Sequence, residues 1–443
     1  MASSAGAAGP APRTGGGAAP LAGAGTSSVA GGREPAAGTA AGPSQRSRGC
    51  APSAGAGGDR APVEHVALLL LAPYASGAEH QTLALCRYLR ARCRVTLLTN
   101  DEFAHLLQTD PFFTQYTRDL EVVRLGRAFP AAPAHTPAGA LERAALYPRL
   151  QVEAYRVLRR LRPDVVHLVL APSFFAYAPL FRAVRVPTVL TLSGEMRYVR
   201  RYYGPAKRAV VRHAVARAGA LVVCSADELA NLRLACPGAE RRARLLDNFT
   251  DVRRFRPVDP KERRVVFAAR LHPEKGALLF VDAVARARPL LGHQGVGFAL
   301  LGRGDLERPV AERIAALGLH DTIQRGFTTD LAPVLARSSL FISCQQHENL
   351  GSSSLLEAMA CANAVVATDV GQTWRMVDEA VGARVAPEAG ALAEAMCALL
   401  ADPARLAACG AAARRRVLER YSPGPYLDRL LQVYALARER AGT

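Results

Sequence analysis

Residues 343–371 read SCQQHENLGSSSLLEAMACANAVVATDVG, and this stretch holds the most informative pattern of the chain. An apolar run predicts a strand that ends near Ser343, and a polar loop follows it. The spacing of apolar residues then predicts a helix over Ser353–Cys361, and a β-branched run predicts another strand over Ala364–Thr368. A strand, a helix and a second strand in this order indicate a βαβ unit of a parallel sheet.

The same alternation extends along most of the chain from about residue 64 onward. In the first half, strands are predicted at His65–Ala72, Arg94–Thr99, Glu121–Arg124, Asp164–Leu170, Thr188–Leu192 and Ala220–Ser225. In the second half they are predicted at Val265–Ala269, Gly297–Leu301, Thr322–Arg325, Leu340–Ser343 and Ala364–Thr368. Helices are predicted at Ala78–Ala91, Leu141–Leu161, Gly276–Arg288, Leu306–Leu317, Ser353–Cys361 and Thr373–Ala380. Apolar strands separated by helices are typical of parallel sheets covered on both faces, so we expect an α/β fold.

Two domains are expected, because 443 residues exceed what one hydrophobic core usually supports. The segment Phe249–Arg264 carries two prolines, many charges and little apolar content, so we place a linker at residues 251–263. We expect one Rossmann-like domain at 63–250 and a second at 264–420, facing each other across a cleft. Residues 421–443 are predicted to form a last helix whose apolar face packs back on the N-terminal domain.

Residues 1–62 differ in composition, being almost entirely Ala, Gly, Pro, Ser and Thr with a few Arg. Such a segment buries too little apolar surface to offset its ordering entropy, so we expect a disordered tail. No apolar run typical of a secretory signal follows its start. An organelle transit peptide is the alternative, but the Gly and Pro content favours a plain tail.

Composition argues against several classes of protein. No run approaches the roughly 20 apolar residues that cross a bilayer, so we do not expect a membrane-spanning protein. The nine cysteines form no C-x-x-C pair and no cluster with His at zinc-ligand spacing. We therefore expect reduced thiols, a cytoplasmic location and no bound metal.

The formal charge of +18 fits nucleic acid, an anionic membrane or a negatively charged substrate as partner. No nucleic-acid-binding signature is present, so we expect no nucleic-acid partner. The stretch Arg197–Arg217 interleaves Arg and Lys with Tyr, which allows two interpretations. It is a basic solvated helix face, the interpretation we favour, or a patch for peripheral contact with an anionic membrane.

A phosphate site is suggested by Gly351 and the three serines that follow it. At the start of a helix they offer exposed backbone N–H groups, small side chains and the positive end of the helix dipole. Glu357 follows Ser353 by four residues and so lies one turn along on the same face, where a carboxylate can accept hydrogen bonds from ribose hydroxyls. The alternative is an ordinary capped helix with a surface Glu.

A second cluster runs from Arg270 to Gly276, directly after the strand predicted at Val265–Ala269. Ligands of open α/β sheets bind at the C-terminal ends of the strands, which is where Arg270 and Lys275 are expected. Two cations directed at one diphosphate stabilise the bound donor and the departing group as its charge grows. The alternative is a solvated turn whose charges are incidental.

The order Gly77-Ala78-Glu79, Asp247-Asn248, ARLHPEKG at 269–276 and the stretch quoted above resembles family 4 of the retaining glycosyltransferases, also called glycosyl transferases group 1. The likeness covers residues 65 to 440 approximately. It implies the GT-B fold and transfer of a sugar, without metal or other cofactor, from a UDP- or GDP-sugar to an acceptor hydroxyl. Saccharide and lipid-linked acceptors both stay open.

The resemblance also implies roles for individual residues. Arg270 and Lys275 would contact the diphosphate, and Glu357 the donor ribose. The backbone around Leu350, Gly351, Ser352 and Ser353 would meet the phosphate and the sugar. Gly77 would allow close approach to the donor across the cleft, and the Gly326-Phe327 turn resembles the segment that contacts the base.

Two departures from the family pattern affect the catalytic assignment. The family's first Glu falls on Asn349, while Glu348 lies one residue earlier. We favour a bulged loop that brings Glu348 into place; the alternatives are that Asn349 makes the contact or that catalysis is weak. The other departure is Thr191–Glu195, where many relatives carry a His, so no single residue of the N-terminal domain is named as the acceptor base. His167 at a strand end is a candidate, although a single strand-end His is more often structural.

A strong protein base is not required, because in a front-face mechanism the leaving phosphate takes the acceptor's proton. Two other functions stay open. The shifted Glu fits a binding or scaffold protein that kept the fold without catalysis. Gly302-Arg303-Gly304 fits a dinucleotide-binding oxidoreductase, although the third Gly of G-x-G-x-x-G is missing.

Overall fold

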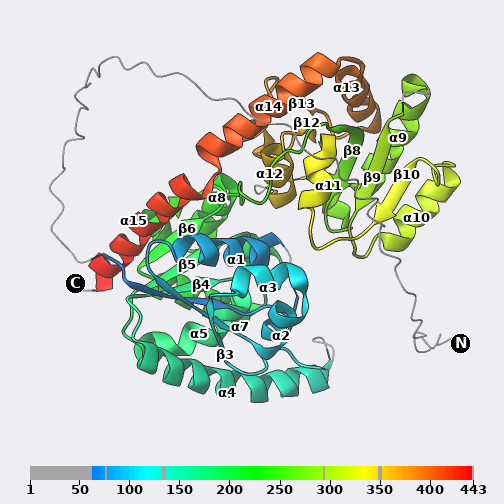
Figure 1. Cartoon of the computed structure of the whole chain (residues 1–443). Coiled ribbons are helices and arrows are strands. Elements are labelled where there is room, and N and C mark those ends of the chain that lie inside the picture. The colour runs from blue at the N-terminus through cyan, green and yellow to red at the C-terminus, as the bar shows by residue number, and fades with distance from the viewer. Residues whose placement is uncertain (1–61, 75–76, 132–135, 293–294, 348–351, 442–443) are drawn as a thin grey trace, which may run out of the picture. The chain divides into compact units, whose positions relative to one another are not determined.

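The computed structural model describes residues 62–441 except for 75–76, 132–135, 293–294 and 348–351 (Figure 1). The tail predicted for residues 1–62 therefore lies almost wholly outside the described residues. The described part of the chain forms one compact unit that contains two parallel β-sheets with helices packed on them. This arrangement confirms the predicted α/β fold with two Rossmann-like sheets.

The N-terminal sheet has seven strands in the order β3-β2-β1-β4-β5-β6-β7. Its strands are β1 His65–Leu70, β2 Arg94–Thr99, β3 Glu121–Arg124, β4 Val165–Val169, β5 Thr188–Leu192, β6 Ala220–Val223 and β7 Ala243–Leu245. The helices between them are α1 Gly77–Leu89, α2 Asp101–Thr109, α3 Pro111–Thr117, α4 Pro137–Leu161, α5 Ala171–Tyr177, α6 Glu195–Arg201, α7 Pro205–Arg217 and α8 Ala226–Ala235, with short 3-10 turns η1 Ala178–Arg182 and η2 Ala239–Arg242.

The C-terminal sheet has six strands in the order β10-β9-β8-β11-β12-β13. Its strands are β8 Glu262–Ala268, β9 Gly297–Leu301, β10 Ile323–Gly326, β11 Ser338–Ser343, β12 Ala364–Thr368 and β13 Gly382–Val385. The helices are α9 Ala277–Leu291, α10 Glu307–Ala316, α11 Ala332–Arg337, α12 Ser353–Ala360, α13 Ala389–Ala401, α14 Pro403–Arg420 and α15 Pro423–Ala441, with 3-10 turns η3 Pro273–Lys275 and η4 Thr373–Arg375.

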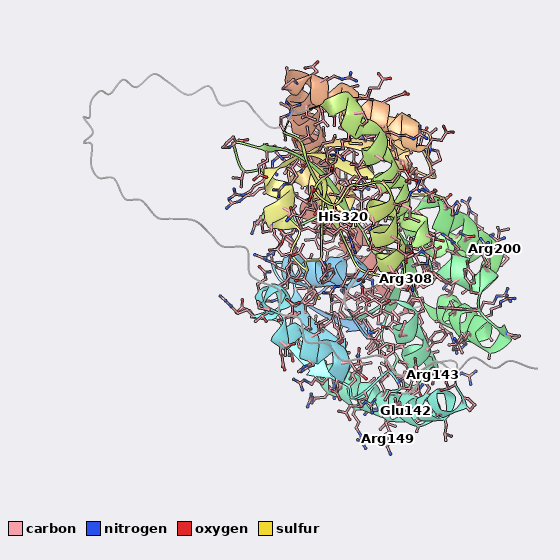
Figure 2. The ribbon with its side chains drawn as sticks, turned by 90° about the vertical axis from the view of Figure 1, so that its right-hand side faces the viewer. Glu142, Arg143, Arg149, Arg200, Arg308 and His320 are labelled. Atoms are coloured by element: carbon pink, nitrogen blue, oxygen red, sulfur yellow. The ribbon has the colours of Figure 1, made fainter. Side chains whose placement is uncertain are left out.

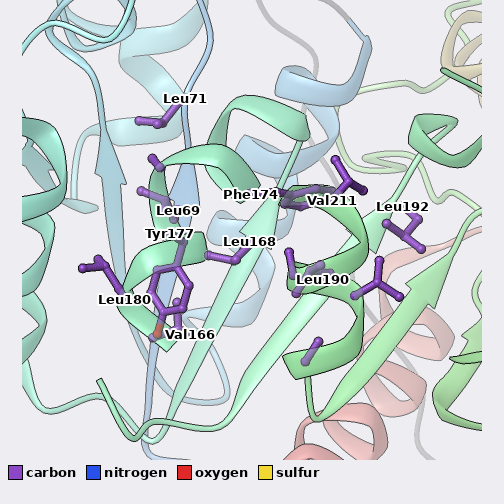
Figure 3. Packing of buried hydrophobic residues seen from close by; sticks show 14 of the residues in the cluster. Leu69, Leu71, Val166, Leu168, Phe174, Tyr177, Leu180, Leu190, Leu192 and Val211 are labelled. Atoms are coloured by element: carbon purple, nitrogen blue, oxygen red, sulfur yellow. The ribbon is translucent and has the colours of Figure 1, made fainter. Parts of the chain in front are cut away.

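Both sheets are buried on their two faces because their central strands are apolar throughout. All six residues of β1 are buried, as are all five of β4 and of β5. In the core on one face of the N-terminal sheet, Leu69, Leu168 and Leu190 of three neighbouring strands pack with Phe174 of α5 (Figure 3). The strand order changes direction at β1 and β4 in this sheet and at β8 and β11 in the other, which are the points where such sheets bind ligands.

The outer faces of the helices carry charged side chains. Figure 2 shows this for Arg149 of α4, Arg200 of α6 and Arg308 of α10, all of which are exposed. Among the described helices, none is by itself long and apolar enough to cross a membrane. Residues 389–401 and 403–441 pass that test only as a pair bent by 104°. All eight cysteines in the described part of the chain are free.

The last helix, α15, packs on the N-terminal sheet although it follows the C-terminal one. It contacts α1 and the strands β4, β5 and β6. Leu430 and Tyr434 of α15 are fully buried in the second core of that sheet. The approach is close at Gly219, where a Cβ atom would lie only 2.9 Å from the carbonyl oxygen of Ala437. The C-terminal helix is therefore an integral part of the N-terminal core.

Two short edge strands, β7 and β13, were not predicted, and the helix predicted at Thr373–Ala380 is wrong. Only the 3-10 turn η4 forms there, and it ends at Arg375. The chain turns at Asp378, whose side chain accepts hydrogen bonds from the Ala380 amide at 3.1 Å and from Arg416 at 2.8 Å. This turn leads directly into β13, so a regular helix cannot continue.

Candidate active site

A cavity of about 840 Å³ lies where the C-terminal ends of strands from both sheets meet. Residues after β1, near the C-terminal ends of β4 and β5, and after β6 line it on one side. Residues after β8, β9, β10 and β11 line it on the other. Predicted site residues among the lining are Gly77, Arg270, Lys275, Phe327, Ser352, Ser353 and Glu357. The structure thus gathers into one site residues that are separated by up to 280 positions in sequence.

Arg270 and Lys275 follow β8, as predicted, and both line the cavity. Lys275 Nζ donates a hydrogen bond to Gln345 Oε1 at 3.1 Å, which ties it to the end of β11. Gly276 has a φ of +70°, and a Cβ atom there would lie 2.1 Å from the carbonyl oxygen of Cys344. Only glycine fits this close approach, so the residue fixes the turn that presents Lys275.

Two helix N-termini meet at the cavity, those of α1 and α12. A Cβ atom on Gly77 at the start of α1 would lie 3.4 Å from Ser353 Oγ at the start of α12. Ser352 and Ser354 are linked through their hydroxyl groups at 3.2 Å. Because both helix dipoles place their positive ends here, the cavity wall favours an anion at this point.

Glu357 lies on α12 one turn beyond Ser353 and lines the cavity, so it is not an ordinary surface residue. Burial raises the pKa of its carboxyl to about 7, with Arg254 acting to lower it and Asp330 to raise it. Arg254 itself forms a 2.6 Å ion pair with Asp330 and lies over the Phe112 ring at 4.5 Å. Near neutral pH, Glu357 is therefore present both as the carboxylate, which accepts hydrogen bonds, and as the protonated acid, which can donate one.

Phe327 and Arg303 form the end of the cavity next to β9 and β10. The Phe327 ring is 51% exposed, and the Arg303 guanidinium lies 4.5 Å from its centroid. The amide of Gly302 donates to the Gly326 carbonyl at 2.9 Å, so Gly326 supports this corner but does not line the cavity. Sequence reasoning named Phe327, but considered Arg303 only as part of the stretch Gly302-Arg303-Gly304 and gave it no role beside Phe327.

His167 is fully buried between two hydroxyl groups. Its Nδ1 lies 2.9 Å from the Tyr434 hydroxyl and its Nε2 lies 2.7 Å from Thr191 Oγ1. Burial lowers the pKa of the ring to about 3. Both nitrogens are engaged within the protein, which favours the structural role over that of an acceptor base.

His80 is a cavity residue that sequence reasoning missed. It lies on α1 one turn after Gly77, between Phe112 and Phe113, with both ring centroids 5.0 Å away. Burial lowers its pKa to about 4, so the ring is neutral at physiological pH. The available signal was its helical spacing from Gly77, which places both residues on one face of α1.

Four predicted site residues, Glu348, Asn349, Leu350 and Gly351, lie outside the described residues. Within the described part of the chain, no group of three or more His, Cys, Asp or Glu side chains is arranged to hold a metal ion.

Two parallel-sheet lobes with an anion-directed cavity between their strand ends define a GT-B type of protein. Two family models match the chain, "Glycosyltransferase Family 4" at residues 75–254 and "Glycosyl transferases group 1" at residues 262–402. Together they span most of the described residues. The chain therefore belongs to the family 4 glycosyltransferases.

Curated relatives agree with this assignment. The chain is 32% identical over 192 residues to alpha-maltose-1-phosphate synthase of Mycobacterium tuberculosis, and 30% identical over 194 residues to that of Mycolicibacterium smegmatis. Each match covers 40% of this chain and 49% of the relative. The chain thus spans about half the length of the curated relatives that it matches.

Solved structures share the fold at low sequence identity. Anabaena HepE in complex with UDP and glucose is similar with a TM-score of 0.67 and 19% identity, over 84% of this chain and 99% of that chain. Sucrose-phosphate synthase from Thermosynechococcus elongatus has a TM-score of 0.65 and 21% identity, over 84% and 98%. The catalytic domain of Starch Synthase IV from Arabidopsis thaliana, bound to ADP and acarbose, has a TM-score of 0.64 and 14% identity, over 86% and 100%.

Proposed function

We propose that the protein transfers a sugar from a UDP- or GDP-sugar to an acceptor hydroxyl, with retention of configuration and without a metal ion. The observation that carries the proposal is the convergence of Arg270, Lys275 and the α12 N-terminus on one cavity. A diphosphate is the ligand whose charge these groups match. UDP in HepE and ADP in the starch synthase support a nucleotide ligand of this class.

The donor would lie along the C-terminal side of the cavity. Its diphosphate would be held between the two cations and the backbone amides at Ser352 and Ser353. Glu357 would bind the ribose, and the Phe327 ring would meet the base. The volume of about 840 Å³ falls within the usual range of ligand pockets, roughly 300–1,000 Å³, and leaves room for an acceptor.

In the proposed reaction, the bond between the anomeric carbon and the phosphate oxygen breaks as the acceptor oxygen bonds to that carbon on the same face. The acceptor's proton passes to the departing phosphate oxygen. Arg270 and Lys275 stabilise the charge that grows on this leaving group, the role that a divalent cation has in other transferases. A protein base is not needed, which fits a His167 whose nitrogens are both hydrogen-bonded.

The sugar contact is assigned to Glu348 on the resemblance alone, with Asn349 as the alternative. Replacing Glu348 by Gln and Asn349 by Ala separates the two. We expect the first change to lower kcat strongly and the second to leave it nearly unchanged. The reverse result assigns the contact to Asn349.

The decisive experiment measures thermal stabilisation of the full chain by UDP-, GDP- and ADP-sugars, with and without EDTA. We expect one nucleotide class to stabilise the protein equally in both conditions, because a ligand that binds the native state raises its stability. NMR of the product anomer then tests retention. No response to any donor contradicts the proposal, and binding without transfer supports a non-catalytic binding protein.

We place the protein in the cytoplasm, which suits its free cysteines.

A further inference from the structure

Helices α6 and α7 form a basic segment that the proposed transfer reaction does not use. From Met196 to Ala226 the sequence contains seven Lys or Arg residues and no Asp or Glu. Around the junction of the two helices lie six cationic or tyrosine residues, which we call the α6–α7 surface. They are Tyr198, Arg200, Arg201, Tyr202, Tyr203 and Lys207.

The three tyrosines of this surface form one cluster, in which Tyr198 and Tyr202 are open to solvent and Tyr203 is partly buried against the core. The Tyr198 ring centroid lies 5.5 Å from that of Tyr202 and 6.5 Å from that of Tyr203. Tyr198 is 49% exposed and Tyr202 is 59% exposed. A basic helix face that only meets water has no need of exposed aromatic rings, so this cluster argues against the solvated-face interpretation.

The cations of the surface contact neutral groups. Arg201 lies 5.7 Å from the Tyr202 ring centroid, and Lys207 lies 5.7 Å from that of Tyr203. Arg200, which Figure 2 shows on the outside of α6, donates to Asn231 Oδ1 at 2.8 Å. Since these contacts neutralise no charge, the surface presents positive charge to an external partner.

We propose that the α6–α7 surface binds an anionic lipid bilayer. Cations attract the anionic headgroups, and tyrosines have an apolar ring and a polar hydroxyl that suit the interface between headgroups and acyl chains. A single-stranded RNA is the competing partner, because bases stack on aromatic rings. The rings of Tyr202 and Tyr203 each have a cation against one face, which leaves less of the ring free for a base to stack on. We therefore favour the bilayer over RNA.

The same helix leads from this surface to the cavity. Ser193, two residues before α6, lines the cavity, and Arg197 of α6 is ion-paired with Glu274 next to Lys275. A bilayer held at the α6–α7 surface would therefore lie close to the cavity on the N-terminal lobe, the lobe expected to bind the acceptor, as a lipid-linked acceptor requires. This acceptor class rests on the proposed function, whereas the membrane contact itself does not.

The test is co-sedimentation of the full-length protein with phosphatidylcholine vesicles, with or without phosphatidylserine. We expect binding only to the anionic vesicles. In the variant Arg200→Gln/Arg201→Gln the partition coefficient should fall about 25-fold, because each basic residue near an anionic surface contributes about a fivefold gain. Tyr198→Ser/Tyr202→Ser should weaken the binding that remains at high salt, which depends on the rings rather than on charge.

The matched control is Arg415→Gln/Arg420→Gln, which removes two exposed cations from α14. It should bind anionic vesicles like the wild type. The proposal would be overturned if the control lost as much vesicle binding as Arg200→Gln/Arg201→Gln, or if the α6–α7 variants bound vesicles like the wild type. It would also be overturned if the α6–α7 variants lost binding to an oligonucleotide instead of to vesicles. Thermal stabilisation by a donor nucleotide is measured on each variant, so that a failure of the membrane contact is distinguished from a failure of the proposed transferase or of folding.

Discussion

Arg197 of α6 donates a hydrogen bond to Glu274 at 2.5 Å, which joins a helix of the N-terminal sheet to the turn that carries Lys275. The Glu274 carbonyl also accepts from the Gln346 amide at 3.0 Å. Burial acts to raise the pKa of the Glu274 carboxyl, but the hydrogen bond and charge of Arg197 outweigh it and the pKa is lowered. The ion pair therefore helps to hold the Lys275 side of the cavity against the other lobe.

Breaking this ion pair should weaken donor binding modestly. Both side chains are partly exposed, so we expect Arg197→Ala or Glu274→Ala to cost about 0.5–1 kcal/mol in the free energy of donor binding. The double variant should cost no more than either single one, because the same interaction is lost. Calorimetric affinities of the four proteins test this. Strictly additive losses would show that the two residues act independently.

Removing the positive charge of Arg270 or Lys275 should weaken the binding of nucleoside diphosphates more than that of nucleosides. A hydrogen bond to a charged group contributes about 1.5–3 kcal/mol, so Arg270→Ala or Lys275→Ala should each weaken UDP or GDP binding by about tenfold or more. Affinity for the free nucleoside should stay the same. Arg286→Ala, an exposed cation on α9, is the control and should leave both affinities unchanged. Similar losses for nucleoside and diphosphate would contradict the assignment.

Glu357 should give donor binding a pH dependence. Its pKa of about 7 means that the carboxylate, the form that accepts two ribose hydroxyl hydrogen bonds, becomes dominant as the pH rises. We expect affinity for the intact nucleotide sugar to increase by at most about tenfold from pH 6 to pH 8. Glu357→Gln should bind weakly with no such trend. If the affinity of the wild type fell as the pH rose, the Glu357 carboxylate would not be the acceptor of the ribose hydrogen bonds.

Replacing Phe327 should weaken the binding of the nucleotide base and leave the binding of the phosphates unchanged. Stacking of a base on an aromatic ring contributes about 1–3 kcal/mol, so Phe327→Ala should weaken nucleotide binding about fivefold or more. Phe327→Tyr keeps the ring and should retain most of the affinity. Inhibition of transfer by inorganic pyrophosphate should be the same in all three proteins. If pyrophosphate inhibition changes as much as nucleotide affinity, the ring has a structural role instead.

Two carboxyl groups are buried behind the cavity wall formed by Ser193 and Cys224. Glu195 is 6% exposed and accepts from the Ser193 amide at 2.5 Å, and Glu228 is 1% exposed and accepts from the Met196 amide at 2.8 Å. Burial, and secondarily the charge of Glu228, raises the pKa of Glu195 to about 8. The native state therefore retains a proton that the unfolded chain loses above its ordinary pKa.

This proton should make the protein less stable as the pH rises. Between the unfolded pKa of about 4.3 and the native pKa of about 8, the native state binds more protons, so the free energy of unfolding falls with pH. Glu195→Gln should remove up to about 1.4 kcal/mol per pH unit of this slope. Urea titrations at several pH values measure it, with the exposed Glu312→Gln as control. An unchanged slope would place the titrating proton elsewhere.

The central strands were predictable because their sequences are apolar on both faces. The bounds of β2, β5, β9 and β12 match the predicted ranges, and those of the edge strand β3 match because it contains two adjacent valines. The short strands β7 and β13 were missed since they contain partly exposed edge residues and lack a continuous apolar run. The predicted helix after Thr373 was wrong because the Asp378 turn depends on Arg416, a contact between residues distant in sequence.

The gathering of Arg270, Lys275 and Ser353 at one cavity was predictable for a related reason. Each lies in the connection between a strand and the helix that follows it, or at the start of that helix, and parallel strands bring such residues to one edge of the sheet. The Arg197–Glu274 pair depends on how the two lobes meet, which no local pattern encodes. The contact of Arg303 with the Phe327 ring joins loops that follow two different strands, whereas His80 had a local signal in its helical spacing from Gly77.

The return of α15 to the N-terminal sheet has a practical consequence for anyone who divides the chain. A fragment that stops at residue 250 would lack Leu430 and Tyr434, and would expose His167 and the apolar face of β4 to water. The first half should therefore be insoluble when expressed by itself. Appending residues 423–441 to it through a flexible spacer should restore a soluble, folded fragment.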